Sequence, residues 1–135
     1  MAHQRLHTLN ARQLHPGSEL DVDMARVVRA GKHIFLSGLT ALDLDGKMVG
    51  VGDPVAQANQ AMTTAKKLLE DAGSSLDHVC KVTTYITDRA YRVAIYGEVG
   101  RWLKGVFPCG TGIIVNGLPL PEMLVQLDLQ AVIPE

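Results

Sequence analysis

The amino-acid sequence predicts one α+β domain, a two-layer sandwich in which helices pack on one face of a mixed sheet. Apolar residues at three- and four-residue spacing between residues 53 and 73 indicate an amphipathic helix. Strict alternation of apolar and polar residues from 124 to 133 indicates a strand that is buried on one side. The chain of 135 residues, 47% hydrophobic and 20% charged, has the length and composition of one globular domain with its own core.

The expected order of elements is β-β-α-β-α-β-β, preceded by an N-terminal arm. Residues 1–20 are mixed in character and are interrupted by Pro16-Gly17, so we expect them to form that arm and residues 21–135 to form the domain. Residues 24–30 (MARVVRA) and 33–37 (HIFLS) are predicted strands. The Gly-Lys pair between them is typical of a tight hairpin.

Two helices are predicted. The first has Asp53 as its N-cap and a proline in its first turn, and it ends at Gly73. The second follows Asp88 and contains two glycines, Gly97 and Gly100. A glycine inside a helix costs about 1 kcal/mol relative to alanine. We therefore expect another backbone to approach the second helix closely at these positions.

Three more strands are predicted after the first helix. They cover residues 79–87 (VCKVTTYIT), 111–116 (TGIIVN) and 124–133 (LVQLDLQAVI), and Cys80 is expected to be a small buried residue of the first of them. In the last strand Gln126, like the other polar residues, is expected to point away from the helices. One helix layer covers only one face of the sheet, so the other face is expected to meet water or another subunit.

Composition and motifs exclude several classes of function. The net charge is −1 and the 13 Lys and Arg residues are dispersed, so a nucleic-acid-binding surface is not expected. The chain has no apolar run of the roughly 18 residues that a membrane span requires and no signal-peptide pattern, which favours the cytoplasm. No metal-ligand spacing, P-loop or dinucleotide-binding glycine motif occurs. We therefore expect neither a metal nor a cofactor.

Two short segments have the small residues that present backbone N–H groups to a ligand. Ser37-Gly38 ends a predicted strand, and Cys109-Gly110-Thr111-Gly112 precedes one, where successive amides are able to cradle a carboxylate. An ordinary turn and an ordinary glycine-containing loop are the alternatives, and composition alone favours them. Arg101 and Lys104, late in the second predicted helix, are either partners of an anionic ligand or part of a solvated face.

Three longer segments resemble the RidA/YjgF/UK114 family, also described as endoribonuclease L-PSP. They are HIFLSGLTALDLDGKMVG, EDAGSSLDHVCKVTTYITD and LVQLDLQAVIPE, and they occur in the family's order and spacing over residues 24–133. The resemblance implies a fold like that of chorismate mutase and a homotrimer that binds small molecules in clefts between its subunits. It also implies hydrolysis of reactive enamines and imines, in which an arginine of the family binds the substrate carboxylate.

The chain departs from the family where that chemistry is carried. Gly110 stands at the arginine position, Met24 at that of a tyrosine, Gln126 at that of a water-positioning glutamate and Tyr96 at that of an asparagine. Relative to the family, the chain also has an insertion around Pro119, in the segment LPLPEM. A glycine in place of arginine makes the cleft roomier and less positive, which favours a larger or less acidic ligand. The Ser37-Gly38 position and the hydroxyl of Thr111 match the family.

These matches and departures predict a hydrolytic deaminase or related hydrolase. Gln126 and Thr111 are the expected catalytic residues, with Gln126 orienting a water molecule. The remaining candidates are expected to bind the ligand: Ser37, Gly38, Met24, Arg26, Tyr96, Cys109, Gly110 and Gly112.

Three alternatives stay open. The main alternative to the enzyme is a non-catalytic binding or regulatory trimer, since the chain lacks the family's arginine and its acid/base group. Endoribonuclease activity is disfavoured because the chain lacks a basic patch. Arg26, two residues beyond Met24 on a predicted strand, is either a relocated cation of the cleft or a residue of the solvent face.

Overall fold

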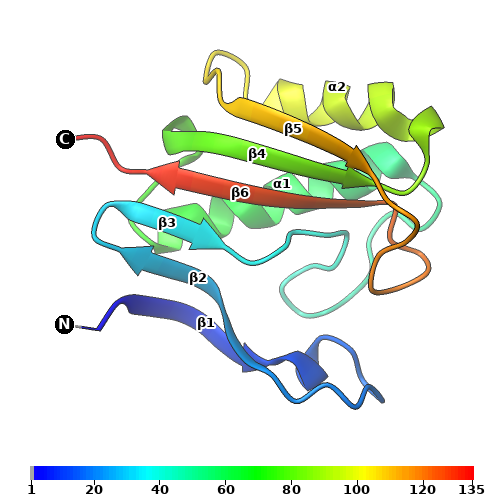
Figure 1. Cartoon of the computed structure of the whole chain (residues 1–135), viewed down its shortest axis with the longest axis horizontal. Coiled ribbons are helices and arrows are strands. Elements are labelled where there is room, and N and C mark those ends of the chain that lie inside the picture. The colour runs from blue at the N-terminus through cyan, green and yellow to red at the C-terminus, as the bar shows by residue number, and fades with distance from the viewer. Residues whose placement is uncertain (1) are drawn as a thin grey trace.

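The computed structural model describes residues 2–135 and shows a six-stranded sheet with two helices on one face (Figure 1). The helices are α1 (Pro54–Asp71) and α2 (Arg92–Trp102). The strands are β1 (Gln4–Asn10), β2 (Asp23–Ala30), β3 (His33–Leu36), β4 (Val79–Ile86), β5 (Cys109–Ile114) and β6 (Val125–Val132). Three short 3-10 helices, Ala11–Gln13, Leu76–His78 and Arg89–Tyr91, complete the regular structure of the described residues. The α+β class is confirmed.

The sheet is mixed and has the order β1-β2-β3-β6-β4-β5. Strands β1, β2 and β3 form an antiparallel meander, and β6 lies antiparallel between β3 and β4. Strand β5 runs parallel to β4. A parallel pair needs a long crossover, and α2 supplies it. The crossover places α2 beside the edge strand β5, where a cavity forms.

The first strand, β1, was not predicted. It lies in the segment expected to be an arm, and it pairs with β2 from Gln4↔Arg29 to Asn10↔Asp23. The alternation of buried and exposed residues in β1 is weak. His7 adopts a φ of 53°, and this irregular geometry breaks the two-residue period of the strand. Nε2 of His7 lies 2.8 Å from Oδ2 of Asp71 at the end of α1, so the N-terminal strand is also held to the helix layer.

The predicted apolar stripe of α1 forms the centre of the core. Asp53 accepts a hydrogen bond from the Ala56 N–H at 3.0 Å, and Gly73 adopts the left-handed conformation (φ 81°) just beyond the helix, as expected. The stripe packs against the inward side chains of β6. The fully buried apolar residues of these two elements are Ala58, Ala61, Met62, Ala65, Leu68, Leu69, Val125, Leu127, Leu129 and Ala131.

Two local expectations were wrong. Cys80 is exposed, because an irregularity in the β4–β6 pairing between Val79 and Lys81 leaves it outside the regular alternation. At Gly97 and Gly100 no close approach exists within the described residues, since an added Cβ at either position would meet no heavy atom within 4 Å. The second helical segment begins with a 3-10 turn capped by Asp88, whose Oδ1 accepts from the Ala90 N–H at 2.8 Å.

The sheet face opposite the helices is open, as the alternation in β6 predicted. Gln126 and Asp128 lie on it half-buried, and every residue of the edge strand β5 is exposed. Ile113 and Ile114 of β5 remain 42% and 41% exposed. None of the helices among residues 2–135 is both long and apolar enough to cross a membrane.

Candidate functional site

A cavity of about 660 Å³ lies between α2, the segment that follows it and the edge strand β5. Its apolar walls come from Val82 of β4, Val99 of α2, and Leu103, Phe107 and Pro108. The other residues that line this cavity are Thr84, Arg92, Tyr96, Gly100, Lys104, Gly105, Gly110, Thr111 and Gly112. A volume of this size is in the range of sites for small organic ligands.

Two glycines of β5 open this cavity. Gly110 pairs with Val82 and Gly112 with Thr84, and the side chains of both partners are buried on the helix side, so positions 110 and 112 also face α2. At Gly112 an added Cβ would coincide with the phenol oxygen of Tyr96. At Gly110 an added Cβ would meet nothing within 4 Å. The sequence therefore leaves room at both positions, and Tyr96 fills only one of them.

Three basic residues of α2 and its C-terminal end differ in their surroundings. The Arg101 Nε lies 2.6 Å from Oε1 of Glu98, which raises the pKa of Arg101, and its guanidinium stacks over Trp102. Arg92 and Lys104 line the cavity instead, and neither forms an ion pair with a carboxylate anywhere in residues 2–135. The Arg92 guanidinium lies over the Tyr96 ring, 5.1 Å from its centroid.

A second hollow, of about 420 Å³, lies on the open face of the sheet. It contains the predicted Gly38 and Gln126 together with Tyr85 and Asp128. The Gln126 amide lies directly over Gly38, where an added Cβ would be 2.5 Å from Nε2. The structure thus brings together Gly38 and Gln126, two candidates that are 88 positions apart in the sequence.

Ser37 and Arg26 lie beside a small cavity of about 40 Å³ rather than in either hollow. The Ser37 Oγ donates to the Ala25 carbonyl at 2.7 Å, and its N–H donates to the Arg26 carbonyl at 2.9 Å. Burial lowers the pKa of the Arg26 guanidinium, and Asp43 opposes this shift. Met24 lines a separate hollow of about 470 Å³ beside β1, and Arg26 is absent from its lining.

The predicted residues of β5 divide between the two faces of the strand. The Thr111 Oγ1 accepts a hydrogen bond of 2.7 Å from Nζ of Lys81. Cys109 pairs directly with Lys81, so these side chains share the open face, away from Tyr96. Lys81 was not among the sequence candidates, although its place on the polar side of a predicted strand was a usable signal. Arg92 was also missed, although it stands four residues before Tyr96 on a predicted helix.

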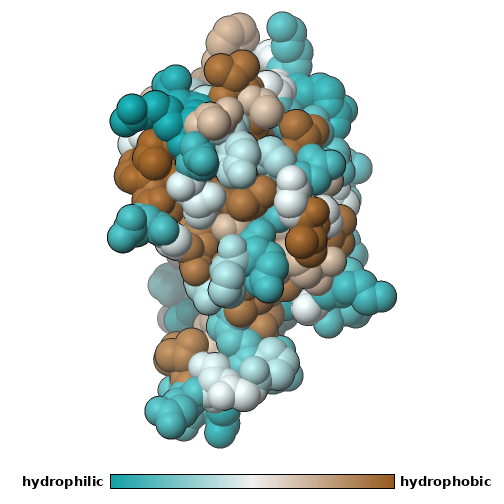
Figure 2. All heavy atoms as spheres, turned by 90° about the vertical axis from the view of Figure 1, so that its right-hand side faces the viewer, coloured by the Kyte–Doolittle hydropathy of each residue, from teal (hydrophilic) through white to brown (hydrophobic). Residues whose placement is uncertain are grey.

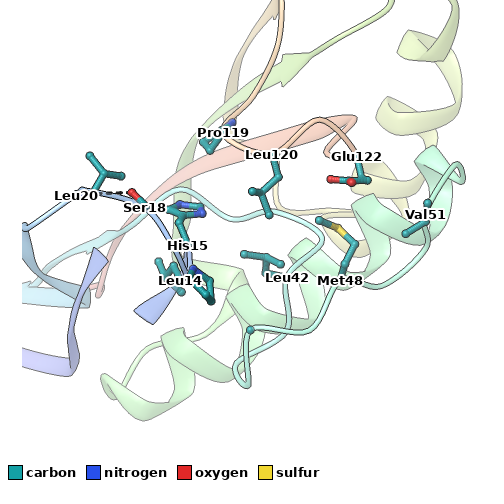
Figure 3. Close-up of a pocket in the computed structure, with 13 residues that line it drawn as sticks. Leu14, His15, Ser18, Leu20, Leu42, Met48, Val51, Pro119, Leu120 and Glu122 are labelled. Atoms are coloured by element: carbon teal, nitrogen blue, oxygen red, sulfur yellow. Dashed lines mark hydrogen bonds between the residues drawn. The ribbon is translucent and has the colours of Figure 1, made fainter. Parts of the chain in front are cut away.

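A further hollow, of about 700 Å³, lies at the loop end of the molecule and contains none of the predicted residues. Figure 2 views this end and shows apolar patches separated by polar ones. The walls come from residues 14–20, 42–51 and 119–122, so the insertion after Pro119 helps to build it. Figure 3 shows Leu42, Met48 and Leu120 gathered around this space, with His15 on the opposite wall. The His15 Nδ1 is buried and has no hydrogen-bond partner among residues 2–135.

Together the fold and these hollows define a small α+β protein with ligand-sized sites at the edge strand β5 and on the open face of its sheet. The sequence model of the family described as Endoribonuclease L-PSP matches residues 22–133. The chain belongs to this family, which is the RidA/YjgF/UK114 family that the sequence resembles.

Individual relatives agree. The chain is 34% identical to Protein DfrA of Myxococcus xanthus over 105 residues, 78% of this chain and 79% of the relative. It is 33% identical to a RutC family protein of Pyrococcus abyssi over 107 residues, 77% of this chain and 81% of the relative.

Among solved structures, a YjgF/YER057c/UK114 family member from Mycobacterium tuberculosis superposes with a TM-score of 0.78 at 21% identity, covering 98% of this chain and 100% of that one. A protein of unknown function from Pseudomonas aeruginosa gives a TM-score of 0.76 at 28% identity over 97% and 92% of the two chains. The predicted family and its chorismate-mutase-like fold are therefore confirmed.

Proposed function

We propose that this protein is a homotrimer that binds a small organic ligand in clefts between its subunits and hydrolyses an enamine, an imine or a related intermediate there. One observation carries the proposal. The residues at the family's functional positions form two separate surface groups, Tyr96 with Gly110 beneath α2 and Gly38 with Gln126 on the open face. A cleft between subunits brings one group of each kind together from two copies.

The surface around these groups suits such an assembly. The edge strand β5 is exposed along its whole length and carries Ile113 and Ile114. On the open face Phe35 of β3 is 44% exposed. An exposed apolar edge strand is a site at which another chain packs. A second subunit over this surface would bury these side chains and close the cleft.

The proposed reaction adds water across a C=N bond. The water oxygen bonds to carbon, the nitrogen takes up the proton, and the carbon–nitrogen bond then breaks to give a carbonyl compound and ammonia. The Gln126 amide orients the water, and the backbone N–H groups near Gly38 and Gly112 polarise the substrate. The Thr111 hydroxyl, held by Lys81, relays a proton from the attacking water to the developing amine nitrogen and is itself unchanged. The new hydroxyl on carbon then gives up its proton to the nitrogen as the carbon–nitrogen bond breaks. Gln126 is no general base, so the water attacks without one.

A specific observation favours a second candidate, a binding or regulatory trimer without turnover. Gln126 stands at the position of the family's glutamate, and its amide is not able to act as a general base toward water. The cleft would then hold its ligand without hydrolysing it.

Two measurements test the proposal. Sedimentation equilibrium is expected to give three times the 14.6 kDa of one chain, and a stable monomer at micromolar concentration would exclude a cleft between subunits. Ammonia release is then measured with imines generated in situ from several amino acids by an amino-acid oxidase. A trimer that releases ammonia no faster than the uncatalysed reaction supports the binding candidate instead.

We also place the protein in the reducing cytoplasm. Its two cysteines, Cys80 and Cys109, are both free and exposed, which suits a compartment that keeps thiols reduced. Endoribonuclease activity is not part of the proposal, since the basic residues form no concentrated patch in the sequence.

A further inference from the structure

We propose that Arg92 binds the anionic group of the ligand, in place of the arginine that the family carries at position 110, and that Lys104, beyond the other end of α2, adds positive charge to the same cavity. The ligand is accordingly an anion with a bulky apolar body. This inference rests on the proposed function, because it assigns a ligand class to the same cleft.

The cavity beneath α2 carries positive charge with no carboxylate to balance it. Glu98 neutralises Arg101, with Nε 2.6 Å from Oε1, and this pair lies outside the cavity. Arg92 and Lys104 line the cavity, and no carboxylate of the described chain lies within 4 Å of either charge. No acidic side chain lines this cavity. An anion entering it therefore meets positive charge alone.

Arg92, one of the two cations, is already positioned. The Arg92 guanidinium rests over the Tyr96 ring at 5.1 Å, a cation–π contact that limits its motion. Tyr96 is in turn held by its phenol oxygen, which fills the space that Gly112 leaves without a Cβ. A planar guanidinium fixed in this way loses less entropy when it grips a carboxylate with two hydrogen bonds.

The walls and the size of the cavity suit a ligand with a bulky apolar body. The inner walls are the apolar side chains of Val82, Val99 and Leu103, with Pro108 at the β5 side. A cavity of about 660 Å³ is far larger than a three-carbon imine needs. The two cations belong to α2 and the segment just beyond its C-terminal end, whereas the space beside Gly110 on β5 is empty. The apolar body of the ligand therefore has room to lie over Gly110.

The probe for this site is phenylpyruvate, a 2-oxo acid with an aromatic body. Its dissociation constant is measured by titration calorimetry with the assembled protein, beside pyruvate and the uncharged analogue phenylacetone. We expect phenylpyruvate to bind more tightly than both. The double variant R92Q/K104Q is expected to weaken phenylpyruvate about tenfold or more and to leave phenylacetone unchanged, since only the charged interaction is removed.

R101Q is the matched control, because Arg101 is on the same helix but is paired with Glu98 outside the cavity. Its affinity for phenylpyruvate is expected to equal that of the unmodified protein. Equal affinity of R92Q/K104Q and the unmodified protein, or no binding of phenylpyruvate to the latter, would overturn the inference.

The inference and the proposed function fail separately. If the trimer releases ammonia and R92Q/K104Q does so at the same rate, the proposed function stands and the assignment of the cations is wrong. If R92Q/K104Q weakens the binding of phenylpyruvate but the unmodified protein releases no ammonia, the cations are assigned correctly and the proposed hydrolysis is wrong.

Discussion

The phenol oxygen of Tyr96 occupies the position that a Cβ on residue 112 would take, so the tyrosine of α2 and the glycine of β5 fit together only as this pair. Position 112 carries no positive φ, so alanine there is free of backbone strain and differs from glycine by its methyl group alone. Two positions earlier, Gly110 faces the same cavity with nothing within 4 Å of its missing Cβ.

This difference predicts unequal effects of two alanine substitutions on one strand. G112A forces Tyr96 out of its place and is expected to lower the free energy of unfolding by about 1–3 kcal/mol, the cost of overpacking. G110A is the control and is expected to change it by less than about 0.5 kcal/mol. Urea denaturation of both variants is the measurement. Equal losses in the two variants would contradict this packing of Tyr96.

A second prediction concerns Gly38 and Gln126 on the open face. An added Cβ at Gly38 would lie 2.5 Å from Nε2 and 2.9 Å from Cδ of Gln126, which is the far end of a flexible side chain. G38A is therefore expected to cost less than about 1 kcal/mol of stability while displacing the amide that orients water. Its rate of ammonia release is expected to match that of Q126A. The double variant G38A/Q126A is expected to lose nothing further, and additive losses would show that the two residues act independently.

The buried Gln57 predicts a larger loss of stability. Its Nε2 donates to the Gly50 carbonyl at 3.1 Å and to the Glu122 carbonyl at 2.9 Å, and its Oε1 accepts from the Leu124 N–H at 2.8 Å. Q57L leaves three backbone groups without a partner and is expected to cost about 3 kcal/mol or more, because each unpaired buried group costs about 1–3 kcal/mol.

The control for Q57L is Q60L, on the next turn of the same helix. Gln60 makes a single side-chain hydrogen bond, of 3.1 Å to Thr64. Its replacement is expected to cost less than about 1 kcal/mol. Thermal and urea denaturation compare the two variants, and similar losses would show that the Gln57 bonds contribute little to holding the loops before α1 and β6.

The contact between β1 and α1 predicts a dependence on acid. Hydrogen bonds from Lys67 and His7, each 2.8 Å, lower the pKa of the Asp71 carboxyl below its ordinary value of 3.8. A group whose pKa is lower when folded stabilises the protein above its unfolded pKa, and this contribution disappears as the pH falls through the folded pKa. The loss therefore belongs to the range below about pH 4.

The measurement is the urea midpoint from pH 7 to pH 2.5. Between pH 4 and the lower limit the midpoint of the unmodified protein is expected to fall more steeply than that of D71N, which has no charge to lose. D77N serves as the control, because Asp77 is exposed and forms no ion pair with a residue of the described chain. Parallel curves for D71N and the unmodified protein would show that the Asp71 contacts do not stabilise the fold.

Local information in the sequence was sufficient for α1 and β6. The capping Asp53, the apolar stripe and Gly73 all lie within one stretch of chain, and helical hydrogen bonds join residues only four apart. In β6 the alternation of Val125, Gln126 and their successors alone defines the buried and open faces. The order of the elements and the family motifs were also readable in this way, which is why the fold class and the family were predicted correctly.

Pairing between distant segments decided what the sequence did not show. Strand β1 exists because it hydrogen-bonds to β2, and Cys80 is exposed because of an irregular register against β6, neither of which is a local property. The division of Thr111 and Gly112 between opposite faces of β5 follows from the register with β4. The placement of Arg92 and Gly110 around one cavity follows from the crossover that returns the chain under α2. Contacts of this kind depend on which strands and helices meet, and that is a property of the tertiary structure alone.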